Sequence, residues 1–418
     1  MVNAALVTKV FILFVALKSL IEAYLDRRNM KNILANRNEV PEKFKEQISL
    51  ADHQKAADYS IAKIKASQFF QFIEVAILLM WTLGGGIEAM DRLSKDLIGE
   101  GTLTTGVFFF MVYLAISFFL SLPQSVYTTF VIEEKFGFNK TTVKTFITDI
   151  IKSTLVGLVI FVPILYGLLW IMASVGELWW LYAFVFLTLI QIVLMWAYPT
   201  FIAPIFNKFT PLEEGEVKNK IMELLARIDF KASGLFVMDG SKRSAHGNAY
   251  FTGFGKNKRI VFFDTLINSL NPNEVEAVLA HELGHFKRKH ILKMIVKSIV
   301  MSFIAFFIMG QLLHSEIFFK GHGVQTVSTH AGLLLFMMVS GIYTFFIGPI
   351  SSYQSRKFEY EADEFAATHS NARDLINALV KMYKDNASTL TPDEMYSNWY
   401  HSHPPAIKRV SFLETFLK

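Results

Sequence analysis

Two histidines and a glutamate stand at a spacing that suits metal chemistry in the segment His281-Glu282-Leu283-Gly284-His285. On a helix, side chains four residues apart share a face, so both imidazoles can bind one ion. Zn²⁺ favours such nitrogen ligands, and a catalytic zinc keeps one position open for water. Glu282 is placed to take a proton from that water. The pattern predicts a hydrolytic zinc centre, and the alternative is the solvated polar face of an unrelated helix.

A catalytic zinc needs a third protein ligand, and the acidic run 359–363 offers one. Glu359 and Asp363 lie four residues apart and share a helix face, so Glu359 is predicted as the ligand. Asp363 is then expected to accept a hydrogen bond from a ligand imidazole and hold its orientation. The alternative is an exposed acidic helix that pairs with neighbouring basic residues. Glu361 faces another side of the helix and is expected to be solvated.

Two further polar clusters could contact a peptide. In the run 401–405, His403 could donate a hydrogen bond to the oxyanion that forms when water attacks a carbonyl, and Arg409 could hold substrate or support the site. The alternative for this run is an ordinary helix start. Asn248 begins an alternating apolar segment that favours an extended edge, which could pair with a peptide backbone. A plain hairpin is the alternative there.

The chain around these residues predicts the elements that position them. Asn271, Pro272 and Glu274 form a helix-start signal, with an N-cap, a proline at the first position and an acid at the third. Apolar residues then recur at helical spacing: Val275, Val278, Leu279 and Leu283. His290 lies about 140° round the same helix from His285 and is expected to meet solvent or head groups. Upstream, 216–229 is predicted as an amphipathic helix, with 235–238 and 260–263 as short strands.

The rest of the chain is unusually apolar, with 52% hydrophobic residues among 418 and a mean hydropathy of +0.36. Seven stretches are long enough to cross about 30 Å of hydrocarbon: 4–24, 68–90, 104–126, 150–172, 178–200, 291–313 and 332–352. The predicted regions are a five-span membrane region (1–201), a metalloprotease region (202–290), spans six and seven (291–353) and a C-terminal region carrying the third ligand (354–418). These patterns predict an all-α membrane protein with a small α+β zinc-metalloprotease region.

Charge and cysteine content narrow the setting further. Basic residues alternate between successive loops, which predicts an external N-terminus and places the C-terminus and the zinc site in the cytoplasm. The net charge of +5 is attributed to this topology. Without a basic groove interleaved with aromatics, no nucleic-acid partner is expected. The chain has no cysteine, so a metal must be held by His, Asp or Glu. The first apolar stretch, with Lys9 and Lys18, is expected to be a retained anchor.

The motifs together resemble the type I CAAX prenyl endopeptidases, which are integral-membrane zinc metalloproteases. The resemblance spans nearly the whole chain and also includes the run 130–140, Phe-Val-Ile-Glu-Glu-Lys-Phe-Gly-Phe-Asn-Lys. It implies one Zn²⁺ per chain, and it matches ligands and base to the residues above: His281, His285, Glu359 and Glu282. It implies substrate contacts at Asn248, His403 and Arg409, and it implies that the seven spans enclose a chamber containing the zinc.

Eukaryotic members remove the last three residues of a prenylated Cys-a-a-X peptide. This chain is shorter than those members are expected to be, and its end, Leu417-Lys418, lacks a dilysine signal. A prokaryotic plasma-membrane protease is therefore predicted, which acts as a monomer on a peptide or protein substrate.

An alternative from another class is a transport or lipid-binding membrane protein with a structural metal, in which Glu74 and Glu88 line a path. A structural zinc would need four protein ligands. The sequence offers three ligands and a base, which favours catalysis.

Overall fold

The computed structural model describes residues 3–252 and 259–417, and in this part seven helical stretches are long and apolar enough to cross a membrane. The number of spans predicted from hydropathy is confirmed. Six of the seven contain at least 31 residues, which is roughly 46 Å of helix. Because the hydrocarbon layer is only about 30 Å thick, these helices continue beyond the membrane and can carry polar side chains outside it.

Some spans are single long helices, and others consist of consecutive helical segments joined by short 3-10 or π-helical turns. They comprise α1 (Ala4–Ala35), α2 (Leu50–Trp81), α4 (Leu103–Tyr127) with the π-helix η2 (Thr128–Glu133), α5 (Val143–Ser174), then η3 (Gly176–Leu178), α6 (Trp179–Ala197), η4 (Tyr198–Ile202) and α7 (Ala203–Phe206), then α11 (His290–Leu312), and finally α13 (Thr329–Thr344), η6 (Phe345–Ile347) and α14 (Gly348–His369). A short turn, η1 (Glu42–Phe44), lies between α1 and α2.

The second span differs from its predicted extent of 68–90. Helix α2 begins at Leu50 and ends at Trp81, and the chain turns through Gly85, which has a left-handed backbone with φ +78°. A side chain at Gly84 would meet the Met80 carbonyl oxygen at 2.7 Å. The glycines therefore allow a tight reversal where hydropathy predicted a continuous helix. A separate helix, α3 (Gly86–Ile98), follows and packs against α4.

The seventh span has no break at the predicted boundary between residues 353 and 354. Helical structure runs from Thr329 to His369, and α14 crosses that boundary as one helix with a proline in its first turn. Glu359 and Asp363 therefore stand on the extension of the last membrane helix.

A small sheet and its helices form the remaining unit. Its elements are β1 (Phe209–Pro211), α8 (Glu216–Arg227), β2 (Gly234–Met238), η5 (Gly240–Lys242), β3 (Ala249–Thr252), β4 (Arg259–Phe263), α9 (Asp264–Ser269) and α10 (Pro272–Lys287), with α15 (Ala372–Asp385), α16 (Glu394–Tyr400) and α17 (Ala406–Glu414) from the C-terminal part. The strand order is β1-β2-β4-β3, with β2 and β4 parallel and the two outer strands antiparallel to them. The predicted strands and the helix from Glu216 are confirmed. Strand β3 lies at the edge of the sheet and pairs antiparallel with the next strand, β4, so the extended edge and its hairpin alternative are both met.

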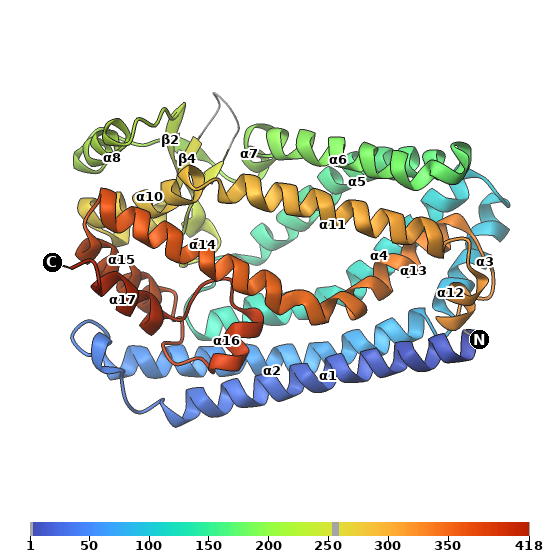
Figure 1. The fold of residues 1–418 in the computed structure, drawn as a ribbon, viewed down its shortest axis with the longest axis horizontal. Helices are drawn as coiled ribbons and strands as arrows, with labels where there is room; N and C mark the ends of the chain where they lie inside the picture. Colours follow the sequence, from blue (N-terminus) through green and yellow to red (C-terminus); the bar gives the residue numbers. More distant parts are fainter. Residues whose placement is uncertain (1–2, 253–258, 418) are drawn as a thin grey trace.

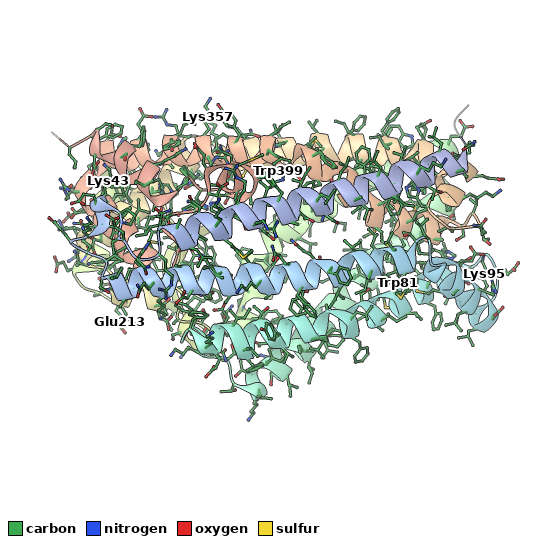
Figure 2. All side chains as sticks on the ribbon, turned by 90° about the horizontal axis from the view of Figure 1, so that it is seen from below. Lys43, Trp81, Lys95, Glu213, Lys357 and Trp399 are labelled. Atoms are coloured by element: carbon green, nitrogen blue, oxygen red, sulfur yellow. The ribbon has the colours of Figure 1, made fainter. Side chains whose placement is uncertain are left out.

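The sheet unit and the N-terminus lie at opposite ends of an elongated molecule (Figure 1). The short helices α3 and α12 (Glu316–Gly321) cover the N-terminal end. Figure 2 shows α1 and α2 running side by side along the molecule, with Lys95 at one end and Lys43 at the other. One apolar core lies under the sheet, around Phe262 and Val275, and a second lies among the membrane helices, around Phe11 and Phe109.

Candidate metal centre

Helix α10 carries the first histidine pair, and its start is fixed by local chemistry. The Asn271 side chain accepts a hydrogen bond from the Glu274 backbone at 3.0 Å, and Glu274 accepts one from the Asn271 backbone at 2.9 Å. This capping box confirms the predicted helix start. Glu274 is buried and also accepts a hydrogen bond from Lys381 of α15 at 2.7 Å. The helix start is thus tied to the C-terminal helices.

Helix α10 crosses α14 closely at Gly284. A Cβ atom added there would stand 3.0 Å from the Ala362 Cα atom and 3.1 Å from its carbonyl oxygen. The absent side chain therefore lets the two helices approach. The contact brings one face of α10 against the face of α14 that carries Glu359.

Three side chains converge at this crossing. The Nε2 atoms of His281 and His285 lie 3.2 Å apart, and the Glu359 carboxylate oxygens lie 3.5 Å and 3.3 Å from them. Among the described residues this is the only group of three or more His, Asp or Glu side chains close enough to hold one metal ion. His281 and Glu359 are buried, and Glu359 Oε2 has no hydrogen-bond partner. This oxygen lies 3.5 Å from His281 Nε2 and 3.6 Å from Arg409 Nη1 without forming a hydrogen bond, and a buried carboxylate beside two imidazole nitrogens fits a bound divalent cation.

The Nδ1 atom of His281 faces a buried ion pair between Asp363 and Arg409. Asp363 Oδ1 lies 2.8 Å from His281 Nδ1, and Arg409 donates two hydrogen bonds of 2.7 Å to the same carboxylate. Burial opposes the charge on Arg409, but the Asp363 carboxylate raises the pKa of Arg409 above its usual range, so it stays protonated. The sequence left Arg409 open between substrate contact and support; its guanidinium is buried and directed to Asp363, while the residue also lines the cleft.

The second histidine has a support that the sequence interpretation missed. His285 Nδ1 lies 3.0 Å from His290 Nδ1, and His290 Nε2 lies 2.9 Å from the Glu361 carboxylate. His290 is fully buried and stacks on Phe358 at 4.1 Å between ring centroids. The expectation that His290 meets solvent is wrong, because α10 ends at Lys287 and the chain turns through Lys289, whose φ is +58°. The helical rotation assumed for His290 does not apply across that turn. Glu361, expected to be solvated, is partly exposed but paired with His290.

The remaining predicted residues line a cleft of about 540 Å³ beside the three side chains. The Glu282 side chain has no hydrogen-bond partner in the described part of the chain, and burial raises the pKa of its carboxyl group. Asn248 accepts a hydrogen bond from the Ala249 backbone at 2.8 Å. His403 Nε2 lies 3.5 Å from Glu359, and desolvation lowers the pKa of its imidazole. The cleft thus offers a carboxylate, an amide and an imidazole around the convergent cluster, which is formed by His281, His285 and Glu359.

The run 130–140 lies outside this cleft but fixes one of its walls. Glu133 accepts a hydrogen bond from Tyr59 at 2.5 Å and lies 3.4 Å from His246 Nε2. Arg243 forms a two-point ion pair with Asp149 of α5, at 2.7 and 2.9 Å. The segment that leads into Asn248 and β3 is therefore bound to the membrane helices.

Comparisons with known proteins agree with this architecture. Residues 29–208 match the family described as CAAX prenyl protease N-terminal, five membrane helices, and residues 211–416 match Peptidase family M48. The CAAX prenyl protease 1 homolog of Taenia solium is 35% identical over 96% of this chain and 94% of its own length. CAAX prenyl protease 1 of Saccharomyces cerevisiae is 35% identical, covering 94% of this chain and 92% of the relative. The human homolog is 37% identical over 80% of each chain.

A solved structure is similar over almost the entire fold. The crystal structure of S. mikatae Ste24p superposes with a TM-score of 0.89 at 35% identity, covering 97% of this chain and 98% of that one. This likeness confirms the predicted fold class, in which seven membrane helices enclose a chamber and a small α+β region carries the convergent cluster.

Proposed function

The chain belongs to peptidase family M48 and to its CAAX prenyl proteases, and on this basis we propose a zinc-dependent endopeptidase that cleaves peptide bonds beside the membrane surface. Membership of the family makes it a membrane-embedded metalloprotease. The identity of the metal, the residues that hold it and the substrate are the content of the proposal.

We assign His281, His285 and Glu359 as the metal ligands. The observation that carries this assignment is the buried Glu359 carboxylate, whose two oxygens face the two imidazole nitrogens and one of which makes no hydrogen bond. Two nitrogens and one carboxylate oxygen suit Zn²⁺ and leave room for a further ligand. When bound, zinc supplies a Lewis acid that polarises a carbonyl and makes water easier to deprotonate.

The protein's own groups perform the proton transfers and hold the peptide. Glu282 accepts a proton from the attacking water and returns it to the leaving amine. Burial raises the pKa of Glu282, which makes its carboxylate a stronger base toward the water. His403 donates a hydrogen bond to the developing oxyanion. The peptide backbone lies along the edge strand β3, with Asn248 at its start. Asp363 and Arg409 hold His281 in place.

The substrate follows from the names of the relatives, which are CAAX prenyl proteases. We propose cleavage of a C-terminal Cys-a-a-X peptide with a prenylated cysteine, by a monomer in the bilayer. The alternating basic loops support an active site on the cytoplasmic side. The prokaryotic plasma membrane stays a prediction. A transporter with a structural metal is disfavoured, because the cluster has three ligands and the Glu282 carboxylate stands beside it in an open cleft.

The test separates the base from the ligands. In Glu282→Gln, bound zinc stays near one per chain while cleavage of a prenylated Cys-a-a-X peptide falls about 10³-fold, since general acid–base catalysis contributes on that order. In Glu359→Gln, bound zinc itself falls. Zinc is measured by elemental analysis and cleavage by mass spectrometry.

Glu364→Gln is the matched control, because Glu364 lies on the same helix α14 and its one ion pair with a described residue is to Arg288 at 3.5 Å. It keeps both zinc and activity. Near wild-type cleavage by Glu282→Gln would remove Glu282 as the base, and unchanged zinc in Glu359→Gln would require another third ligand.

A further inference from the structure

A second cavity adjoins the catalytic cleft on the other side of Asn248. Its volume is about 590 Å³, within the range of sites that bind small ligands. Helices α1 and α2, the segment 244–248 and the end of α15 form its walls. Asn248, Asn386 and His401 line both spaces, so the two are neighbours with a common wall.

The ionisable side chains that line this cavity are basic, apart from tyrosine. The lining contains one lysine, Lys63, and two histidines, His246 and His401, but no aspartate or glutamate. Amide and hydroxyl groups, including Asn386, Ser388 and Thr389, supply further donors. A cavity with this composition favours an anionic group.

Lys63 lacks a counter-ion among the described residues. Its Nζ atom lies over the Tyr59 ring, 4.8 Å from the centroid, and no ion pair joins it to a described carboxylate. Glu133, the acid bound to Tyr59, is engaged with that hydroxyl and with His246 and does not line the cavity. Lys63 lies in the first half of α2, and its side chain is exposed. Its ammonium group is therefore open to pair with an anionic ligand.

The wall opposite α2 is rigid. Asn386 Oδ1 accepts a hydrogen bond from the Gly247 backbone at 3.1 Å and lies 3.2 Å from His246 Nδ1. The His246 ring stacks on Phe138 at 4.3 Å between centroids. The cavity is therefore shaped in advance of any ligand, which lowers the cost of binding.

We propose that this cavity binds the three residues that follow the scissile bond, and that Lys63 pairs with the free α-carboxylate at their end. Three extended residues span about 10 Å, so a peptide that leaves the cleft past Asn248 ends inside the adjoining cavity. An ammonium group forms a charge-assisted hydrogen bond with a carboxylate. The inference rests on the proposed function and adds to it: the enzyme locates the cleavage site by its distance from a free C-terminus.

The test compares two peptides that differ only at the C-terminus. One prenylated Cys-a-a-X peptide carries a free carboxylate and the other a carboxamide. For wild-type full-length protein in lipid nanodiscs, we expect kcat/KM to be about tenfold higher for the acid, in line with hydrogen bonds to charged groups. Lys63→Met keeps the length of the side chain and should abolish this preference by lowering only the rate for the acid. Lys63→Arg should retain the preference.

The control is Lys65→Met, which removes a charge two residues along α2 at a position that lines a different cavity. It should keep the full preference. If wild type cleaves both peptides equally well, or if Lys63→Met slows both by the same factor, the carboxylate subsite is wrong while the protease function stands.

A binding measurement separates the two proposals. Glu282→Gln protein is titrated calorimetrically with the free tripeptide a-a-X and with its amide. Tighter binding of the acid, lost in the double variant with Lys63→Met, supports the subsite even if neither long peptide is cleaved. Cleavage of neither peptide contradicts the proposed function, and equal binding of acid and amide contradicts the subsite.

Discussion

Each histidine of the convergent cluster has a partner on its far nitrogen. For His281 this partner is Asp363, and for His285 it is His290, which in turn meets Glu361. A partner on one ring nitrogen fixes the tautomer and the orientation of the ring, so that the other nitrogen faces the proposed metal position. The two histidines are therefore oriented by different devices, a buried ion pair and a histidine–glutamate relay.

The relay leads to a prediction about metal affinity. Replacing His290 with Gln removes the buried imidazole that meets His285 and leaves the ligand histidines intact. Loss of such outer partners typically costs 10–100-fold in metal affinity or activity. We expect zinc affinity to fall by about tenfold, measured by competition with a chelator, and the absorption bands of the Co²⁺-substituted protein to change.

His314→Gln is the comparison, because His314 lies beyond the far end of α11 from the cluster. It should leave both readouts unchanged. An unaltered zinc affinity and cobalt spectrum in folded His290→Gln protein would mean that His290 contributes packing and does not affect metal binding.

The two proposed histidine ligands follow from residue type and spacing alone, because one helical turn decides whether two side chains share a face. The relay does not follow from the sequence. It depends on the left-handed backbone at Lys289, an uncommon conformation for a lysine that no local pattern predicts. The assignment of Glu359 as the third ligand also depends on tertiary structure, because Glu359 reaches the two histidines only through the close crossing of α10 and α14.

At the scale of elements, that crossing depends on Gly284. An added Cβ would lie 3.0 to 3.1 Å from atoms of Ala362 and Phe365, tighter than ordinary contact. In Gly284→Ala, the gain in helix propensity, about 1 kcal/mol, is opposed by overpacking that costs about 1–3 kcal/mol. We expect a lower melting temperature and less tightly held zinc, because α14 must shift away and take Glu359 with it.

A matched variant is available on another helix. Gly157 lies in α5, and nothing stands within 4 Å of the place where its Cβ would be. Gly157→Ala should be neutral or stabilising. If Gly284→Ala behaves like Gly157→Ala in both melting temperature and zinc affinity, the crossing tolerates a methyl group and the glycine is not required there.

Elements with local signals were predictable, and elements set by tertiary geometry were not. The capping residues Asn271 and Glu274 fixed the start of α10 in advance. Hydropathy extended the second span through Gly85 to residue 90, because apolar composition continues where the backbone reverses. It also separated the last span from Glu359, although one helix carries both.

For the whole molecule, the cluster joins parts of the chain that two membrane spans separate. His281 and His285 stand on α10, whose apolar residues pack in the core beneath the sheet, whereas Glu359 stands on the extension of the seventh span. The run 130–140 and the Arg243–Asp149 ion pair make further connections between the sheet unit and the membrane helices. The residues that form such contacts lie far apart in sequence, so neither hydropathy nor motif spacing predicts the contacts.

A metal held by both α10 and α14 should therefore act as a cross-link, and its removal should loosen the whole protein. A ligand that binds only the folded state at 100 times its dissociation constant stabilises it by about 2.7 kcal/mol. We expect a strong chelator to lower the melting temperature of the wild-type protein in detergent by a few degrees, and added zinc to restore it. Glu282→Gln should show the same shift, because that residue is not a ligand in the proposal. Glu359→Gln should start lower and respond little to the chelator. A full chelator response in Glu359→Gln would mean that the stabilising metal is held without the seventh span, and the cross-link would have to be abandoned.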